Sequence, residues 1–311
     1  MYLKAVFKNS PVFVQLLMLL AVFVFGSFLS SLLFQMLIIT KEGASLETIM
    51  NVMQNLLDYP DILRSMQFFQ SLGLFLVPAI ICAWLFSDNY REYLGIDQPV
   101  SKQVVIFTVV SIIVAIPFLN MLVSYNQQMT LPESLKEFEQ LFKEMEETAS
   151  RSVEVMLSTK NVSTIGFNFL TVCVVAAICE EFLFRGLLQT LFGRMIKNPH
   201  ILIWIIAILF SAIHLQFYGF IPRMLLGAWL GYLMYFTKSI WAPVLAHFTN
   251  NLISIGLFYL FQDKPDEMQK FDALGTGSTW WLSFASLALF FFCFSLIIKA
   301  IKNDTIFKSI K

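Results

Sequence analysis

Residues 179–186 read Cys-Glu-Glu-Phe-Leu-Phe-Arg-Gly and lie in the middle of an apolar stretch, 161–193. This stretch is long enough to cross a bilayer as a helix, which takes about 20 apolar residues. Its only charged side chains are Glu180, Glu181 and Arg185. A charged side chain at the centre of a membrane helix costs about 3 kcal/mol on insertion scales, so it needs a partner or a function. These three residues are therefore the first candidates for a functional site.

Helix geometry separates the two carboxylates. Glu181 and Arg185 are four residues apart, on one face of a helix, and can form an ion pair. Glu180 points about 100° away from that face. The spacing predicts that Arg185 neutralises Glu181 and that Glu180 faces another part of the protein. Because a kink can rotate a helix by one residue, Glu181 also stays a candidate for any role given to Glu180.

The composition is that of a membrane protein. Of the 311 residues, 58% are hydrophobic and only 14% are charged, and the mean hydropathy is +0.72. Soluble domains are nearer a quarter charged. With 21 basic and 21 acidic residues there is no excess of positive charge, so nucleic acid is not expected as a partner. The four cysteines all lie in apolar runs without a CxxC motif and indicate neither a disulfide nor a metal site.

Apolar segments with polar loops between them predict an all-α, polytopic membrane bundle of about eight transmembrane helices. Prolines inside three of the segments (Pro78, Pro117 and Pro243) are expected to kink them. The first segment lacks a small-x-small cleavage site and is read as a retained span. The expected spans are 12–39, 66–86, 104–125, 162–192, 201–217, 220–237, 240–261 and 279–298.

Loop charges predict the orientation. The N-terminus, the loops 87–103, 193–200 and 238–239 and the C-terminal tail together carry more basic than acidic residues, whereas the opposite side is acidic. The basic side is expected to be cytoplasmic, which places both termini in the cytoplasm of a protein of the plasma (inner) membrane.

The chain divides into three expected regions. Residues 1–160 form N-terminal helices plus an extracytoplasmic loop, 161–262 form a catalytic helix core, and 263–311 form a final span and a cytoplasmic tail. Within the loop 126–160, apolar residues recur at helical spacing among glutamates. This pattern predicts an amphipathic helix that lies on the membrane or over the bundle, or else a solvated acidic helix.

Three further polar residues lie inside expected spans. His214 is placed in the fifth span, and His247 and Asn251 lie four apart on one face of the seventh. At 1.5 Å per residue, Glu180, His214, His247 and Asn251 lie about 20, 21, 12 and 18 Å from the cytoplasmic ends of their helices. The hydrocarbon core is about 30 Å thick, so all four are predicted near one depth.

That coincidence favours a site over separate structural contacts. A single membrane histidine or asparagine more often forms a hydrogen bond between helices, and a single Glu–Arg pair is more often structural. A carboxylate beside a histidine, however, can hold and deprotonate a water molecule. A second histidine and an amide can donate hydrogen bonds to a developing oxyanion. Together these groups suffice for hydrolysis of an amide.

The motifs Glu-Glu-x-x-x-Arg (180–185), Phe-x-x-x-His (210–214) and His-x-x-x-Asn (247–251) occur in this order. The set resembles the CAAX prenyl protease family, which includes bacteriocin-processing and abortive-infection membrane proteins (CPBP, Abi), over about 160–255. The resemblance implies an intramembrane glutamate-type endopeptidase whose eukaryotic members remove the last three residues of prenylated proteins. By the same resemblance Glu180 activates water with His214, the oxyanion hole is formed by His247 and Asn251, and Glu181 and Arg185 hold the shape of the site.

Three alternatives stay open. A metal-dependent protease would use Glu180, His214 and His247 as zinc ligands with an open fourth position. The sequence lacks His-Glu-x-x-His, and Asn251 is a poor zinc ligand, so metal-free chemistry without a cofactor is favoured. A transporter would use the same residues as a polar pathway, and an immunity or scaffold protein would bind without cutting. The expected partners are the lipid bilayer and a membrane-associated peptide or protein, prenylated or not.

Overall fold

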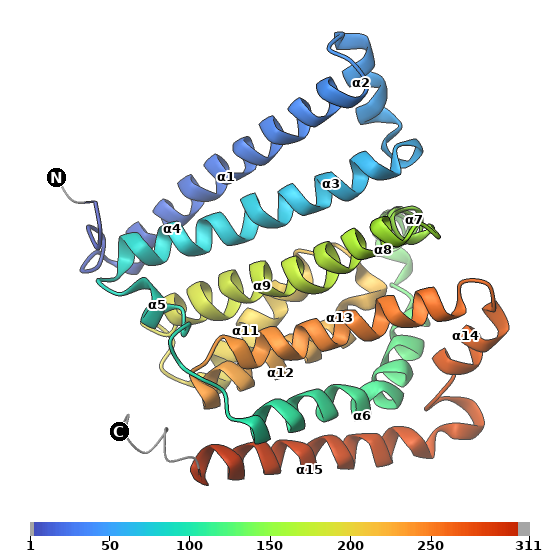
Figure 1. The fold of residues 1–311 in the computed structure, drawn as a ribbon. Helices are drawn as coiled ribbons and strands as arrows, with labels where there is room; N and C mark the ends of the chain where they lie inside the picture. Colours follow the sequence, from blue (N-terminus) through green and yellow to red (C-terminus); the bar gives the residue numbers. More distant parts are fainter. Residues whose placement is uncertain (1–2, 304–311) are drawn as a thin grey trace. The chain divides into compact units, whose positions relative to one another are not determined.

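The computed structural model describes residues 3–303, and all regular secondary structure within them is helical. Figure 1 shows the order of the helices along the chain. The all-α, polytopic helical bundle predicted from the sequence is confirmed. The predicted cytoplasmic tail beyond Asn303 lies outside the described residues.

The helices that are long and apolar enough to cross a membrane coincide with six of the expected spans. The other two expected spans are shorter or more polar. Helix α11 (Pro199–Ala212) has 14 residues, and α12 (Phe220–Thr237) has 18 residues with Arg223 in its first turn. The expected count of eight is therefore not confirmed. The six candidate spans among the described residues are Val12–Lys41, Pro60–Phe86, Lys102–Gln127, Val162–Phe192, Trp241–Phe261 and Trp281–Asn303.

The chain divides into two compact units, each built from two stretches of sequence. The first unit comprises the described residues up to Leu94 together with Ser150–Lys197. The long helix α7 (Lys136–Leu157) passes from the second unit into the first. The helices of the first unit are α1 (Val12–Lys41), α2 (Leu46–Gln54), α3 (Pro60–Gln70), α4 (Val77–Phe86), α5 (Tyr90–Tyr93), α8 (Val162–Asn168), α9 (Ala176–Glu181) and α10 (Gln189–Phe192).

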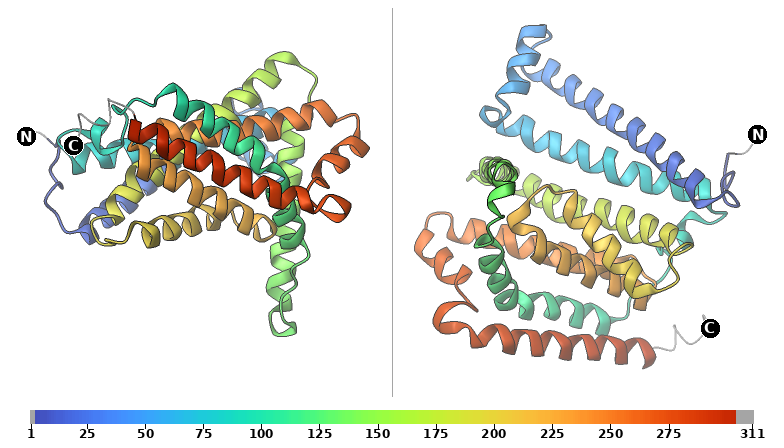
Figure 2. Two further views of the ribbon diagram at one scale, coloured as in Figure 1. Left: turned by 90° about the horizontal axis from the view of Figure 1, so that it is seen from below. Right: turned by 180° about the vertical axis from the view of Figure 1, so that it is seen from behind.

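In the first unit α1 packs along the span formed by α3 and α4 (Figures 1 and 2). Gly26 of α1 faces Gly73, and a Cβ atom on either residue would overlap the backbone of the other helix. Small residues that allow helix backbones to approach are typical of membrane helix pairs. Next to them Ser30 Oγ donates a hydrogen bond to the carbonyl oxygen of Phe69 at 2.9 Å. A π-helical turn, Ser71–Leu76, directly precedes the turn that contains Pro78, where one backbone N–H is missing.

The span that carries the Glu-Glu motif is one helical rod with two π-helical segments. The segment Phe169–Val175 lies between α8 and α9, and Phe182–Leu188 lies between α9 and α10. The second π-helical segment begins directly after Glu181 and contains Arg185. Such π-helical turns are rare and are often found at functional sites.

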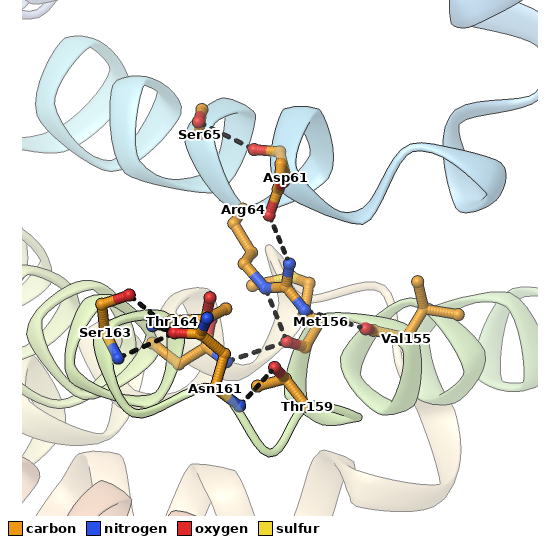
Figure 3. Close-up of polar contacts among 10 residues, drawn as sticks. Asp61, Arg64, Ser65, Val155, Met156, Thr159, Asn161, Ser163 and Thr164 are labelled. Atoms are coloured by element: carbon orange, nitrogen blue, oxygen red, sulfur yellow. Dashed lines mark hydrogen bonds and ion pairs between the residues drawn. The ribbon is translucent and has the colours of Figure 1, made fainter.

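Arg64 of α3 holds the C-terminal end of α7 (Figure 3). Its Nε atom donates to the carbonyl oxygen of Met156 at 2.8 Å and its Nη2 atom to that of Val155 at 3.5 Å. The Met156 oxygen also accepts from Asn168 Nδ2 at 2.8 Å. The guanidinium pairs with Asp61 at 2.8 Å, although Arg64 itself is buried. The last carbonyl groups of a helix lack partners within the helix, and a cation is favourable at this end.

The second unit comprises Gly95–Ala149 and the described residues from Asn198 onward. Within it α6 packs along α15, and α11 packs along α12 (Figure 2). Its buried core is formed by apolar side chains of α6, α12, α13 and α15. The helices of this unit are α6 (Lys102–Gln127), α11 (Pro199–Ala212), α12 (Phe220–Thr237), α13 (Trp241–Phe261), α14 (Pro265–Asp272) and α15 (Trp281–Asn303).

Serines of α15 satisfy the α6 backbone around Pro117. Ser283 Oγ donates to the carbonyl oxygen of Pro117 at 3.0 Å, and the N–H of Phe118 donates to Ser286 Oγ at 3.3 Å. Neighbouring side chains thus take up backbone groups near the proline, as membrane helices require. Pro243 lies in the first turn of α13, where its missing N–H would have no partner in the helix.

Candidate active site

Glu181 and Arg185 form the ion pair that their spacing predicts. Arg185 Nη1 lies 2.8 Å from Glu181 Oε1, and neither side chain has exposed surface. The pair keeps this contact although Arg185 belongs to a π-helical segment. The next residue, Gly186, packs against the buried Leu94. A Cβ atom added at Gly186 would lie only 2.9 Å from Leu94 Cδ2, so a larger residue would crowd this contact.

Glu180 lies on a different face of α9 from Glu181. Its side chain is half-buried, whereas that of Glu181 is completely buried. The two neighbouring carboxylates thus have different surroundings, as the angle of about 100° between successive residues predicts. Glu181 forms the ion pair with Arg185, and Glu180 lies on a less buried face of the helix.

His214 does not lie inside a helix, and the sequence-based prediction of a helix over 201–217 is wrong. Helix α11 ends at Ala212, and His214 sits in the turn that follows. The chain leaves the helix at Leu215, which has a left-handed backbone with φ of 54°. No glycine or proline stands at this point, so the sequence carries no signal for the end of the helix.

One hydrogen bond fixes the proton on the ring of His214. Its Nδ1 atom lies 2.8 Å from the carbonyl oxygen of Phe210. A carbonyl oxygen can only accept, so Nδ1 carries the proton of this bond. In the neutral ring Nε2 then holds the lone pair that can accept a proton. The half-buried imidazole is thereby prepared to act as a base or to orient water.

His247 and Asn251 lie in α13, as predicted. His247 is 5% exposed. Asn251 Oδ1 accepts a hydrogen bond from Asn250 Nδ2 at 3.2 Å, so Nδ2 is the donor side of the Asn251 amide. An imidazole and an amide donor separated by one helical turn match the requirements of an oxyanion hole.

Phe210 brings the two histidines together. Its ring centroid lies 5.3 Å from that of His214 and 5.8 Å from that of His247, both in edge-to-face geometry. Phe210 itself is 1% exposed. The i, i+4 spacing of Phe210 and His214 was visible in the sequence, but the contact with His247 depends on tertiary packing within the second unit, where α11 and α13 both pack against α12. The second unit thus gathers both imidazoles around one buried ring.

The two groups of site residues belong to different units. Glu180, Glu181 and Arg185 lie in the first unit, and His214, His247 and Asn251 lie in the second. The predicted meeting of Glu180 with the histidines at one depth stays a prediction.

Within residues 3–303 no group of three or more His, Cys, Asp or Glu side chains is arranged to hold a metal ion. A separate cavity of about 530 Å³ in the second unit is lined almost entirely by apolar and aromatic side chains of α6, α11, α12 and α15. His200, which sits in the first turn of α11, lines it and bonds the Tyr232 hydroxyl through Nδ1 at 2.9 Å.

Residues 162–253 match the family model of the type II CAAX prenyl endopeptidase Rce1-like domain. This segment is similar to Rce1-like domains. It contains every site residue predicted from the sequence, and it agrees with the CAAX protease (CPBP) family that the motifs resemble. The Rce1-like domain and the apolar helices indicate an integral, multi-pass membrane endopeptidase of CAAX type. No curated protein and no solved structure matches the chain.

Proposed function

We propose that the protein is an intramembrane glutamate-type endopeptidase that hydrolyses a peptide bond in a membrane-associated peptide or protein. The observation that carries this proposal is the pairing of His214 and His247 around Phe210 within an Rce1-like domain. An imidazole with a defined proton on Nδ1 beside a second buried imidazole is better suited to acid–base chemistry than to helix packing alone.

In the proposed reaction Glu180 accepts a proton from a water molecule that the His214 ring orients through Nε2. The oxygen of this water attacks the carbonyl carbon of the scissile peptide bond. His247 and Asn251 Nδ2 donate hydrogen bonds to the oxyanion that forms. The carbon–nitrogen bond then breaks, and the proton held by Glu180 passes to the leaving amine. Glu181 and Arg185 take no part in these steps and keep the helix around Glu180 in place.

The proposal is tested with purified protein in lipid and a fluorogenic peptide ending in Cys-a-a-X, offered with and without a farnesyl group. Glu180→Gln is expected to lower kcat at least 10³-fold, within the range for loss of a general base. Asn251→Ala is expected to lower kcat about 10²-fold, as for loss of one oxyanion donor. Both variants should unfold at the wild-type temperature. Full activity of folded Glu180→Gln would overturn the proposal.

The same measurement separates the alternatives. Cleavage by Glu180→Gln but not by a folded Glu181→Gln variant would assign the base to Glu181. An absence of product with every peptide, together with ion or solute flux in vesicles, would favour a transporter.

We further propose that both termini face the cytoplasm of the plasma membrane and that α7 lies outside. The support is the excess of basic residues in the loops of one side. A cysteine introduced at the exposed Glu154 should react with a membrane-impermeant maleimide added to intact cells. The natural cysteines are all buried and serve as an internal background control. If the cysteine is labelled only after cell lysis, α7 faces the cytoplasm and the orientation is the opposite of the one proposed.

A further inference from the structure

The turn that carries His214 is weakly held by its own backbone. The N–H of His214 bonds the carbonyl oxygen of Ser211 at 3.3 Å, and that of Leu215 bonds Ala212 at 3.1 Å. Leu215 adopts a left-handed backbone with φ of 54°, a conformation that is unfavourable for a residue with a side chain. A strained turn of this kind persists only when its surroundings hold it. The contacts that hold this turn therefore bear on the position of the His214 ring.

Helix α7, from a distant part of the sequence, supplies three of these contacts through two of its residues. The ring of Phe142 stacks on that of Phe217 with centroids 5.1 Å apart and planes inclined by 6°. Glu146 accepts hydrogen bonds from Gln216 Nε2 and from the backbone N–H of Tyr218, each at 3.3 Å. We call this set, Phe142 and Glu146 with residues 216–218, the α7 clasp.

The same loop is also held by residues of α6 and α12. Asn126 at the end of α6 donates to the carbonyl oxygen of Phe217 at 3.0 Å and accepts from the N–H of Ile221 at 2.9 Å. Arg223 Nη2 donates to Gln216 Oε1 at 2.7 Å. Gln216 is thus fixed at both ends of its amide, by Arg223 and by Glu146. The segment that follows His214 is thus held by α6, α12 and the α7 clasp together.

The two α7 residues of the clasp are more buried than their neighbours on the same helix. Phe142 and Glu146 are four residues apart and half-buried, whereas Phe138 and Glu147 are exposed. Lys143 bonds Glu139 at 2.7 Å, and this hydrogen bond lowers the pKa of Glu139 and raises the pKa of Lys143. Glu139 also accepts a hydrogen bond from the backbone N–H of Leu131 at 3.1 Å, so this pair is held by α7 and the segment just before it. The amphipathic helix predicted in 126–160 therefore contacts residues 216–218 through Phe142 and Glu146. The composition of the segment could not predict this contact.

We infer that Phe142 and Glu146 of α7 are positioning residues that fix the turn and thereby the ring orientation and tautomer of His214. The Nδ1–H bond to Phe210 forms only while the turn keeps the ring over the last turn of α11. Release of the clasp lets the turn relax, and the ring then loses this bond. The expected effect of the clasp on kcat rests on the proposed function. Its expected effect on the orientation and tautomer of the His214 ring does not.

The structural part is tested by nuclear magnetic resonance of protein labelled with ¹⁵N in its histidine rings. The chain has three histidines, so the signals are assigned with His200→Gln and His247→Gln variants. In the wild type the His214 signals should show a proton on Nδ1 and none on Nε2. Glu146→Ala and Phe142→Ala should each convert them to a mixture of tautomers. Glu147→Ala and Phe138→Ala are the matched controls on the same helix and should leave them unchanged.

The catalytic part is tested with the fluorogenic peptide. Each clasp variant should lower kcat about 10- to 100-fold with little change in KM, because small misplacement of a catalytic group has effects of this size. A double-mutant cycle between Glu146→Ala and Gln216→Ala should be non-additive, since the two side chains share one hydrogen bond. The unfolding temperature of each variant shows whether it is folded.

The outcomes separate this inference from the proposed function. His214 signals that stay at their wild-type positions in folded clasp variants would overturn the inference, whatever the activity. If the His214 signals change in the clasp variants but the Glu180→Gln variant still cleaves the peptide, the positional role of the α7 clasp is upheld. The proposed role of Glu180 as the base is then wrong. Altered signals with unchanged kcat would show that the clasp orders His214 but does not serve catalysis, and would overturn the positioning role.

Discussion

Arg185 Nη1 and Glu181 Oε1 lie 2.8 Å apart, and both side chains are completely buried in the first unit. Both charges have been removed from water, so the contact between them compensates part of the cost of burying each. Glu180, one residue earlier, is half-buried. The difference in burial distinguishes Glu181, which stabilises the structure through its ion pair, from Glu180, which is the candidate for the catalytic base.

Glu181→Gln should therefore destabilise the protein far more than Glu180→Gln. Removal of one partner of a buried ion pair leaves an uncompensated charge and costs about 3–5 kcal/mol. Unfolding in detergent, followed by circular dichroism, measures the difference. A double variant, Glu181→Gln with Arg185→Met, should recover part of the loss because no charge is left alone. Equal stability of the two single variants would show that the pair does not carry the structure.

Gly227→Ala should weaken the packing that surrounds Phe210. A Cβ atom at Gly227 of α12 would lie 3.1 Å from Phe210 Cδ1 and 3.3 Å from Ala207 Cα. Overpacking of this kind typically costs about 1–3 kcal/mol. Because Phe210 touches both imidazoles, a fall in kcat should accompany the loss of stability.

The matched control for this change is Gly256→Ala in α13, where nothing lies within 4 Å of the added atom. That variant should keep its activity and gain up to about 1 kcal/mol, since alanine favours a helix over glycine. If both variants behave alike, close approach of α11 and α12 at Gly227 is not required.

Arg64→Met should destabilise the junction of α3 with the end of α7. The buried guanidinium donates to the carbonyl oxygens of Met156 and Val155. Hydrogen bonds from a charged group contribute about 1.5–3 kcal/mol. The exposed Arg151, on the same helix end, provides the control Arg151→Met, which should be neutral. Hydrogen exchange of the residues around 150–165 should speed up in the first variant only.

Treatment with a strong zinc chelator such as 1,10-phenanthroline should leave peptide cleavage unchanged. The expectation rests on donor chemistry, because Asn251 offers an amide rather than a ligand that zinc prefers. A non-chelating isomer of the compound controls for effects on the membrane. Inhibition that added zinc reverses would instead assign Glu180, His214 and His247 as metal ligands.

Much of the architecture followed from hydropathy. Long apolar runs predicted the six candidate spans, and most of the predicted ends lie within a few residues of the observed ones, because the bilayer fixes the length of an apolar helix. The second candidate span is the exception, since it begins at Pro60, well before the expected start. The fifth expected span failed for a local reason. Leu215 turns the chain out of α11 without any glycine or proline, so periodicity alone extended the helix through His214.

The sequence by itself determined the helical class, the family motifs and the Glu181–Arg185 pair, because these depend on composition and on spacing along one helix. Tertiary structure decided that Phe210 meets two histidines, that α7 clasps the loop after His214, and that serines of α15 bond the backbone around Pro117. Those contacts join residues far apart in the chain. Their existence depends on how helices pack, and no local pattern of residues encodes the partner of a side chain on another helix.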